Sequence, residues 1–262
     1  MVATQIDFWS NNPCGADGNL HEVMQQRYRL EPWLLRELRT IPFDSKKYLE
    51  VGCGQGIDSF YICAHLNEEC EYTAIDFSSE SVKRATGHTN AANKIFNLKV
   101  TPNFLIGDTL ALNFCDDDFD FVYSYGVFHH TPDPQKAINE VYRVLKNGGQ
   151  AKIFLYRRNS LKVGVAKLLR YFQNLSDKIF FQDRFFYKML RGRKSKFFGS
   201  MILECFGVPF MEWYSDQELR EMFKEFKAIS IEPYGFNLPR ILNEEVDGYN
   251  KFGYLYKIDV TK

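Results

Sequence analysis

The chain has 262 residues, of which 45% are hydrophobic and 25% charged, the usual balance of a soluble globular protein and not of a disordered one. Its 33 basic and 33 acidic residues cancel, so the composition gives no general attraction to nucleic acid, and no nucleic-acid partner is expected. There is no signal-peptide pattern, no apolar run near the ~20 residues that span a bilayer, and no Cys-x-x-Cys pair among six cysteines, so we expect a cytoplasmic protein without disulfides or metal.

Hydrophobic patterning predicts helices that alternate with short strands along most of the chain. The predicted helices are residues 20–39 with a break at Pro32, then 57–67, 79–96, 134–145 and 215–226. The predicted strands are residues 47–51, 71–75, 103–106, 118–123, 151–156, 228–232 and 254–260. This alternation indicates βαβ units, and therefore a parallel sheet with helices on both faces.

A glycine-rich turn follows the first predicted strand. Gly52, Gly54 and Gly56 form Gly-x-Gly-x-Gly, which differs from the dinucleotide pattern Gly-x-Gly-x-x-Gly but also lets the backbone approach a ligand closely. Glu50 lies just before the turn, where a negative charge disfavours a pyrophosphate. The pair of features therefore favours a cationic, amine-bearing ligand such as S-adenosylmethionine over NAD.

Two carboxylates follow the next two predicted strands. Asp76 ends the second strand, where it can accept hydrogen bonds from both hydroxyls of a ribose; the alternative is that it caps the following helix. Asp108 follows the third strand, where its carboxylate could accept a hydrogen bond from the amino group of an adenine. Gly107 would leave room for the adenine ring. For Asp108 the alternative is a simple turn residue.

Together these segments resemble class I S-adenosylmethionine-dependent methyltransferases, and in particular the small-molecule "type 11" group. The similarity covers residues 47 to about 156 and consists of Leu49–Gly56, Ile75–Ser78, Gly107-Asp108, Phe119–Ser124, Val127–His130 and Leu145–Gly149, in that order. The resemblance implies an α/β, Rossmann-like, doubly wound and mostly parallel seven-stranded sheet whose last strand is antiparallel. It also implies a cofactor, S-adenosyl-L-methionine, and a small-molecule acceptor.

The resemblance also implies roles for individual residues. The three glycines would wrap the methionine part of the cofactor, Asp76 would hold the ribose, and Asp108 the adenine. The backbone around Tyr125 and Gly126 would face the amino-acid end. The complete set expected to bind the cofactor is Tyr28, Glu50, Gly52, Gly54, Gly56, Asp76, Phe77, Asp108, Thr109 and Tyr125.

His129 and His130 follow the fourth strand and are the candidate catalytic residues. In related small-molecule methyltransferases a histidine here takes the proton of the acceptor or orients it, a task that suits an imidazole near neutral pH. The alternative is that one or both pack the loop. His129 is the preferred candidate, and oxygen is the preferred acceptor atom, with nitrogen and carbon left open.

Four regions are expected along the chain. Residues 1–40 would form an N-terminal lid and helix, in which Phe8 and Trp9 close over the cofactor and Arg27 or Arg29 meets its carboxylate. Residues 41–156 would form the cofactor-binding core, residues 157–212 a helical cap over the acceptor site, and residues 213–262 the rest of the core sheet. The alternative for the N-terminal residues is a disordered tail that packs on the sheet edge.

The expected cap is strongly basic. Residues 157–196 contain twelve Lys and Arg against two Asp, a net +10 that leaves −10 on the rest of the chain. We expect its Phe and Tyr side chains to point inward and most of its Lys and Arg outward. Three interpretations of the basic charges remain open: they are solvated, they include Arg157 or Arg158 bound to an anionic acceptor, or they contact an anionic membrane peripherally. Two further alternatives for the function are a lipid-linked acceptor and a non-catalytic cofactor-binding module.

Overall fold

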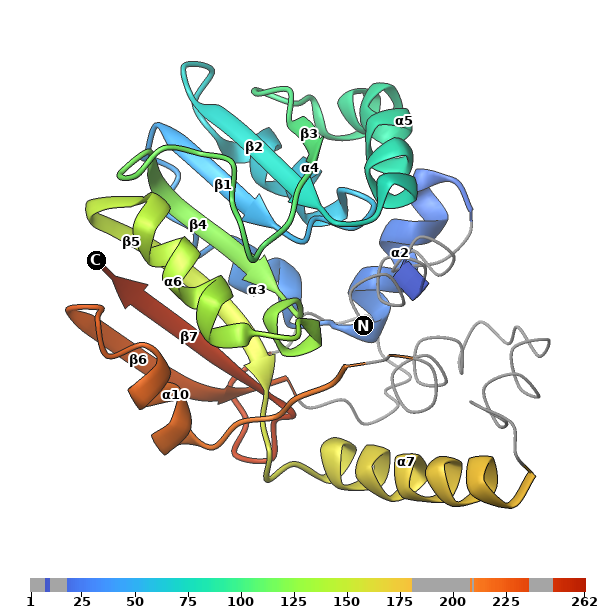
Figure 1. Cartoon of the computed structure of the whole chain (residues 1–262). Helices are drawn as coiled ribbons and strands as arrows, with labels where there is room; N and C mark the ends of the chain where they lie inside the picture. The colour runs from blue at the N-terminus through green and yellow to red at the C-terminus, as the bar shows by residue number, and fades with distance from the viewer. Residues whose placement is uncertain (1–7, 10–17, 181–207, 209, 236–246) are drawn as a thin grey trace.

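Residues 8–9, 18–180, 208, 210–235 and 247–262 are described by the structure, a computed structural model (Figure 1). They form one seven-stranded sheet with the strand order β3-β2-β1-β4-β5-β7-β6. The strands are β1 (Lys47–Val51), β2 (Glu71–Asp76), β3 (Asn103–Ile106), β4 (Phe119–Tyr125), β5 (Leu145–Tyr156), β6 (Ala228–Tyr234) and β7 (Leu255–Thr261). The helices are α2 (Leu20–Leu30), α3 (Leu34–Leu38), α4 (Ile57–His65), α5 (Ser79–Phe96), the short 3-10 helix η1 (Phe128–His130), α6 (Pro134–Val144), α7 (Leu161–Phe180) and α10 (Asp216–Met222).

Strand directions confirm the predicted fold. Strands β1 to β5 pair in parallel, whereas β7 runs antiparallel to both of its neighbours, β5 and β6. The chain first moves outward from β1 through β2 to β3 and then returns to place β4 on the other side of β1. The order therefore reverses between β1 and β4, and open α/β sheets bind ligands beyond the carboxyl ends of the strands at such a point.

Local capping explains where several helices begin. The side chains of Asn19 and Ser215 cap α2 and α10, each in a reciprocal pair with a glutamate three residues on. Asp133 caps α6, and Pro134 occupies its first turn, where no N–H is needed. The predicted helix over residues 20–39 is interrupted around Pro32, as expected. Strand β5 begins at Leu145, earlier than predicted, because Leu145 pairs with Phe119 ahead of an irregularity in the ladder.

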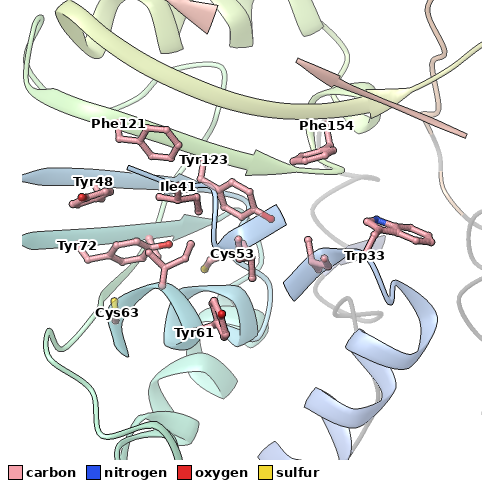
Figure 2. Close-up of a cluster of buried hydrophobic side chains, with 14 of the residues drawn as sticks. Trp33, Ile41, Tyr48, Cys53, Tyr61, Cys63, Tyr72, Phe121, Tyr123 and Phe154 are labelled. Atoms are coloured by element: carbon pink, nitrogen blue, oxygen red, sulfur yellow. The ribbon is translucent and has the colours of Figure 1, made fainter. Parts of the chain in front are cut away.

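Two apolar layers cover the sheet. On one face, aromatic side chains of the central strands pack against α3 and α4, as Figure 2 shows for Tyr48, Phe121 and Tyr123. On the other face, aliphatic residues of the same strands pack against α6 and α10. Because alternate residues of a strand point to opposite faces, neighbours such as Tyr48 and Leu49 fall in different layers.

A buried ion pair joins α3 to the C-terminal half of the sheet. Lys152 on β5 donates to Glu37, and both side chains are almost fully buried. The Tyr234 hydroxyl donates to the same carboxylate at 2.6 Å, and Lys152 also lies 2.8 Å from Asp259. Burial opposes ionisation of Glu37, but Lys152 and these hydrogen bonds outweigh it and hold the pKa of the carboxyl below its usual value.

Candidate functional site

The glycine-rich turn lies at the reversal point of the sheet, between the ends of β1 and β4. Gly52, Gly54 and Gly56 all have left-handed backbones, with φ of +82°, +53° and +79°. A Cβ on Gly52 would lie 2.1 Å from a methyl of Val127, and one on Gly56 would lie 2.7 Å from the ring of Phe104. A Cβ on Gly54 would meet nothing within 4 Å. The outer two glycines thus allow the turn to pack, while the middle one presents backbone to open space.

Asp76 lies against this turn. Its carboxylate accepts the Gly54 N–H at 2.8 Å and the Ser78 N–H at 2.9 Å. Burial raises the pKa of Asp76, and these two hydrogen bonds oppose the rise. The residue that caps α5 is Ser78, so the alternative interpretation of Asp76 as the helix cap is wrong.

Asp108 and Thr109 lie at the same edge of the sheet, just beyond β3, which pairs with β2 up to Asp76 and Ile106. The Asp108 carboxylate accepts the Leu110 N–H at 2.8 Å, so the turn role is present in the structure. The Thr109 hydroxyl is buried and has no hydrogen-bond partner among the described residues. Phe77 follows Asp76 directly and is half-buried. The carboxyl edge thus gathers four of the predicted residues.

Several of the predicted site residues have buried polar atoms without a partner among the described residues. Among the residues that the structure describes, the Tyr28 hydroxyl, the Thr109 hydroxyl and both ring nitrogens of His129 are buried without a hydrogen-bond partner. Such groups are rare in folded proteins because each one loses its hydrogen bonds to water. All three residues were predicted as site residues from the sequence. Together with the exposed backbone of Gly54 and the acceptor Asp76, they fit a polar ligand that bears a ribose and an amino acid.

Glu50 was expected to contact the cofactor, but its side chain points into the protein interior. The side chain is buried, and it accepts hydrogen bonds from the hydroxyls of Ser59 on α4 and Tyr72 on β2, the latter at 2.8 Å. Burial, together with nearby Asp58, raises the pKa of Glu50 to about 7. These contacts face the interior beneath the turn, so they do not support direct contact with a cationic ligand.

The raised pKa of Glu50 predicts a pH-dependent stability. Its stabilising contribution is complete below the unfolded-state pKa of about 4.5 and is lost as pH rises through about 7, because the folded protein then holds a buried charge. Glu50→Gln keeps an acceptor for Ser59 and Tyr72 without the charge. Between about pH 5 and pH 8 we expect this variant to become more stable relative to wild type, and its melting temperature to rise accordingly. The gain in the free energy of unfolding should be at most about 3 kcal/mol.

The control for this measurement is Glu69→Gln, which changes an exposed carboxylate. Thermal denaturation of the three proteins, without added ligand, would be followed across the same pH range. Parallel curves for wild type and Glu50→Gln would contradict the interpretation.

An ion-pair network fixes α2 beside the turn. Arg27 donates to Asp58 on α4 at 2.7 Å and to Glu31 at 2.6 Å, and its guanidinium lies 4.7 Å from the centre of the Tyr125 ring. The Tyr125 hydroxyl donates to Glu31 at 3.0 Å. Arg27 is therefore balanced by two carboxylates of the protein, and Arg29 is exposed. Sequence reasoning missed Asp58 and Glu31, because no spacing in the chain signals contacts 31 and 94 residues apart.

The two candidate catalytic histidines have different surroundings. The His129 ring is fully buried and stacks on Tyr156, with ring centres 3.8 Å apart. Burial, and then electrostatic interaction with His130 and Lys162, push the pKa of His129 well below its usual value, so the imidazole is neutral at neutral pH. A ring nitrogen of His130 lies 3.0 Å from the Phe210 carbonyl, and Trp9 packs against its ring at 5.5 Å. Both histidines make packing contacts, but only His129 has both ring nitrogens buried without a hydrogen-bond partner among the described residues.

The arginines suggested for an anionic acceptor both make contacts within the protein. Arg157 donates to the backbone carbonyls of Lys251 and Gly253, at 2.8 and 3.2 Å. Arg158 donates to Glu218 at 2.6 Å. The Nε of Arg157 is buried without a hydrogen-bond partner among the described residues, so an anionic acceptor held by Arg157 stays a prediction.

In α7, the described part of the expected cap, the predicted orientation of the aromatic side chains is wrong. Residues 181–207 and 209 lie outside the described part of the chain, but α7 is described, and its Tyr171 and Phe172 are exposed. Its Lys167 and Arg170 are half-buried, with Lys167 packed over Trp213 and Arg170 bonded to the Val208 carbonyl. The aromatic residues of this helix thus point outward, and two of its cations point inward.

The chain is similar in sequence to known methyltransferases. Residues 49–153 match the methyltransferase domain family. The chain is 34% identical over 134 residues to tocopherol O-methyltransferase from Arabidopsis thaliana, a match that covers 51% of this chain and 37% of that protein. It is 30% identical over 123 residues to norajmaline N-methyltransferase from Rauvolfia serpentina, covering 47% and 40%. These matches thus span less than half the length of either relative.

Solved structures show the same fold. A SAM-dependent methyltransferase from Thermotoga maritima superposes with a TM-score of 0.60 at 17% identity, covering 91% of this chain and 98% of that one. A SAM-dependent methyltransferase from Aquifex aeolicus gives 0.52 at 18% identity, covering 90% and 92%. Residues 49–153 thus match the methyltransferase domain family, in agreement with the resemblance drawn from the sequence motifs, and the sheet has the class I S-adenosylmethionine-dependent methyltransferase fold.

Proposed function

We propose that this chain transfers a methyl group from S-adenosylmethionine to a small-molecule acceptor, with a hydroxyl oxygen as the preferred acceptor atom. The observation that carries the proposal is the left-handed glycine turn at the reversal point of the sheet, with Asp76 bonded to its middle glycine. S-adenosylmethionine supplies the electrophilic methyl group when bound. The protein contributes chiefly by orienting the acceptor, an effect that can reach ~7–11 kcal/mol.

Each part of the site has a proposed task. Gly54 gives the cofactor access to the backbone, Asp76 accepts the ribose hydroxyls, and Asp108 with Thr109 holds the adenine side. The unpartnered hydroxyl of Tyr28 would meet a polar group of the cofactor. Glu50 is proposed to support the turn from below and not to touch the cofactor.

His129 is proposed to receive the hydrogen bond of the acceptor. Its neutral imidazole has both nitrogens unpartnered, and the stack on Tyr156 fixes the plane of the ring. A hydroxyl gains most from such a group, because its proton must leave as oxygen is methylated. Among the relatives, one is named as an O-methyltransferase, and others as N-methyltransferases of norajmaline and of phosphoethanolamine, so nitrogen acceptors are the second choice.

Binding and turnover test the proposal in sequence. Calorimetry should detect binding of S-adenosylmethionine or its demethylated product and none of NAD. A mixture of phenols and amines would then be incubated with radiolabelled methyl donor, and the products identified by mass spectrometry. Lack of affinity for both forms of the cofactor would overturn the proposal, while binding without transfer to any acceptor would favour the non-catalytic module.

Gly54→Ala offers a sharper check on the turn. The substitution adds a methyl group that meets no protein atom within 4 Å, so we expect a stability loss of only about 1–2 kcal/mol from the left-handed backbone but a large loss of cofactor affinity. Gly148→Ala is the matched control, because Gly148 has φ +81°, equally open surroundings, and a position beside the end of β7. Equal cofactor affinity in both variants would show that the ligand does not approach Gly54.

A cytoplasmic location remains part of the proposal. Cys53, Cys63, Cys70 and Cys115 are free among the described residues. No helix in the described part of the chain is long and apolar enough to cross a membrane.

A further inference from the structure

Helix α7 carries its apolar surface on the outside of the protein. Its exposed large apolar residues are Leu161, Val165, Leu168, Tyr171, Phe172, Leu175 and Ile179. Six of them follow one another at separations of four or three residues, which places them in a single stripe along the helix. The opposite side is buried through Val163, Ala166 and Gln173. A helix at a protein surface normally has the reverse arrangement, so this stripe requires an explanation.

The charges on and near the stripe are almost all positive. Lys162 and Lys178 are exposed on α7, whereas Lys167, Arg170 and the single acidic residue of the helix, Asp177, are half-buried. The surrounding segment of residues 157–196 has a net charge of +10. An apolar stripe bordered by lysines is the pattern of a helix that lies in the plane of a membrane interface.

We propose that α7 docks this protein on the surface of an anionic lipid bilayer. The stripe would enter the boundary between headgroups and acyl chains, and the lysines would meet anionic headgroups. The position of the helix permits this, because α7 lies at one margin of the molecule, at the bottom of the view in Figure 1, apart from the layers that cover the sheet.

Self-association through the same stripe is disfavoured by charge. Two copies of α7 packed along it would bring Lys162 and Lys178 of both chains together, with no exposed acidic residue on the helix to pair with them. An anionic bilayer instead supplies the opposite charge to the exposed lysines of the helix.

Docking would also orient the proposed acceptor site. Near the start of α7, Lys162 lies 3.9 Å from the centre of the Tyr254 ring and 5.8 Å from that of Tyr156, the residue on which His129 stacks. The helix therefore begins beside the candidate catalytic histidine. If the proposed function holds, an acceptor dissolved in the bilayer would reach the site from the docked side, but the docking itself does not depend on methyl transfer.

Vesicle sedimentation tests the docking surface. The full chain would be mixed with vesicles of equal parts phosphatidylcholine and phosphatidylglycerol, and with vesicles of phosphatidylcholine alone. We expect pelleting with the anionic vesicles, little with the neutral ones, and loss of binding as added salt shortens the screening length to about 3 Å at 1 M. Leu168→Glu/Phe172→Glu should weaken partitioning at least about tenfold.

The control is Ile95→Glu, which places one negative charge on a similarly exposed apolar residue of α5 and should pellet like wild type; Leu168→Glu alone is compared with it. Circular dichroism and cofactor binding would verify that each variant is folded. Equal pelleting with neutral and anionic vesicles, no pelleting with either, or unchanged pelleting of the double variant would each overturn the proposal. So would a lipid-free dimer, detected by analytical ultracentrifugation, that the double variant dissociates.

Discussion

Asp76→Ala is expected to reduce the affinity for S-adenosylmethionine about ten- to a hundredfold. The variant removes a half-buried carboxylate that is proposed to accept from a ribose, and hydrogen bonds to a charged group are worth roughly 1.5–3 kcal/mol. It also removes the acceptor of the Gly54 N–H, so the turn loses one of its anchors. Isothermal titration calorimetry with the cofactor and with its demethylated product would measure the loss.

Two comparisons make the Asp76 result specific. Asp116→Ala removes an exposed carboxylate and should bind the cofactor as wild type does. Asp76→Asn keeps an acceptor oxygen and the shape of the side chain, so its affinity should lie between those of Asp76→Ala and wild type. Unchanged affinity in Asp76→Ala would remove this residue from the cofactor site.

His129→Ala is expected to lower turnover by about 10²-fold or more while cofactor binding persists, the usual range for loss of a general base. The physical reason is that the unpartnered, neutral imidazole is the group placed to take a hydrogen bond from the acceptor. Single-turnover kinetics with a saturating methyl donor, using an acceptor found in the screen, would measure the effect on chemistry.

His129→Phe separates chemistry from packing. A phenyl ring preserves the stack on Tyr156 but has no nitrogen, so it should be as slow as His129→Ala. Recovery of turnover in His129→Phe would show that the ring only packs the loop. His130→Phe should remain active, since one nitrogen of His130 already lies beside the Phe210 carbonyl. Loss of turnover in this variant alone would assign the reaction to His130.

The core fold could be predicted because its signals are local. Each signal lies within a few residues of the chain. The signals are three spaced glycines just after a strand, a carboxylate at the end of the next strand, and a capping pair such as Ser215 with Glu218. The order and direction of the strands then follow from the family that these motifs resemble. The boundary of β5 could not be read in this way, because its first residues join the sheet beyond an irregularity in the ladder.

The remainder of the site depends on contacts between distant parts of the chain. Arg27 meets Asp58 across 31 residues, and Tyr125 meets Glu31 across 94, so no spacing rule identifies them. Glu50 was placed near the cofactor by sequence position alone, but Ser59 and Tyr72 draw its carboxylate inward. On α7 the alternation of apolar and basic residues predicted an amphipathic helix, but not which of its sides would face the protein.

The buried pair between Glu37 and Lys152 also constrains the order in which the protein can fold. Glu37 is 115 residues from Lys152 and 197 from Tyr234, so these partners emerge from the ribosome long after α3 has done so. Until they arrive, burial of Glu37 would leave a charge without a counter-ion, at a cost of about 3–5 kcal/mol. The docking of α3 must therefore wait for the C-terminal strands, and the final tertiary structure forms only after most of the chain has been synthesised.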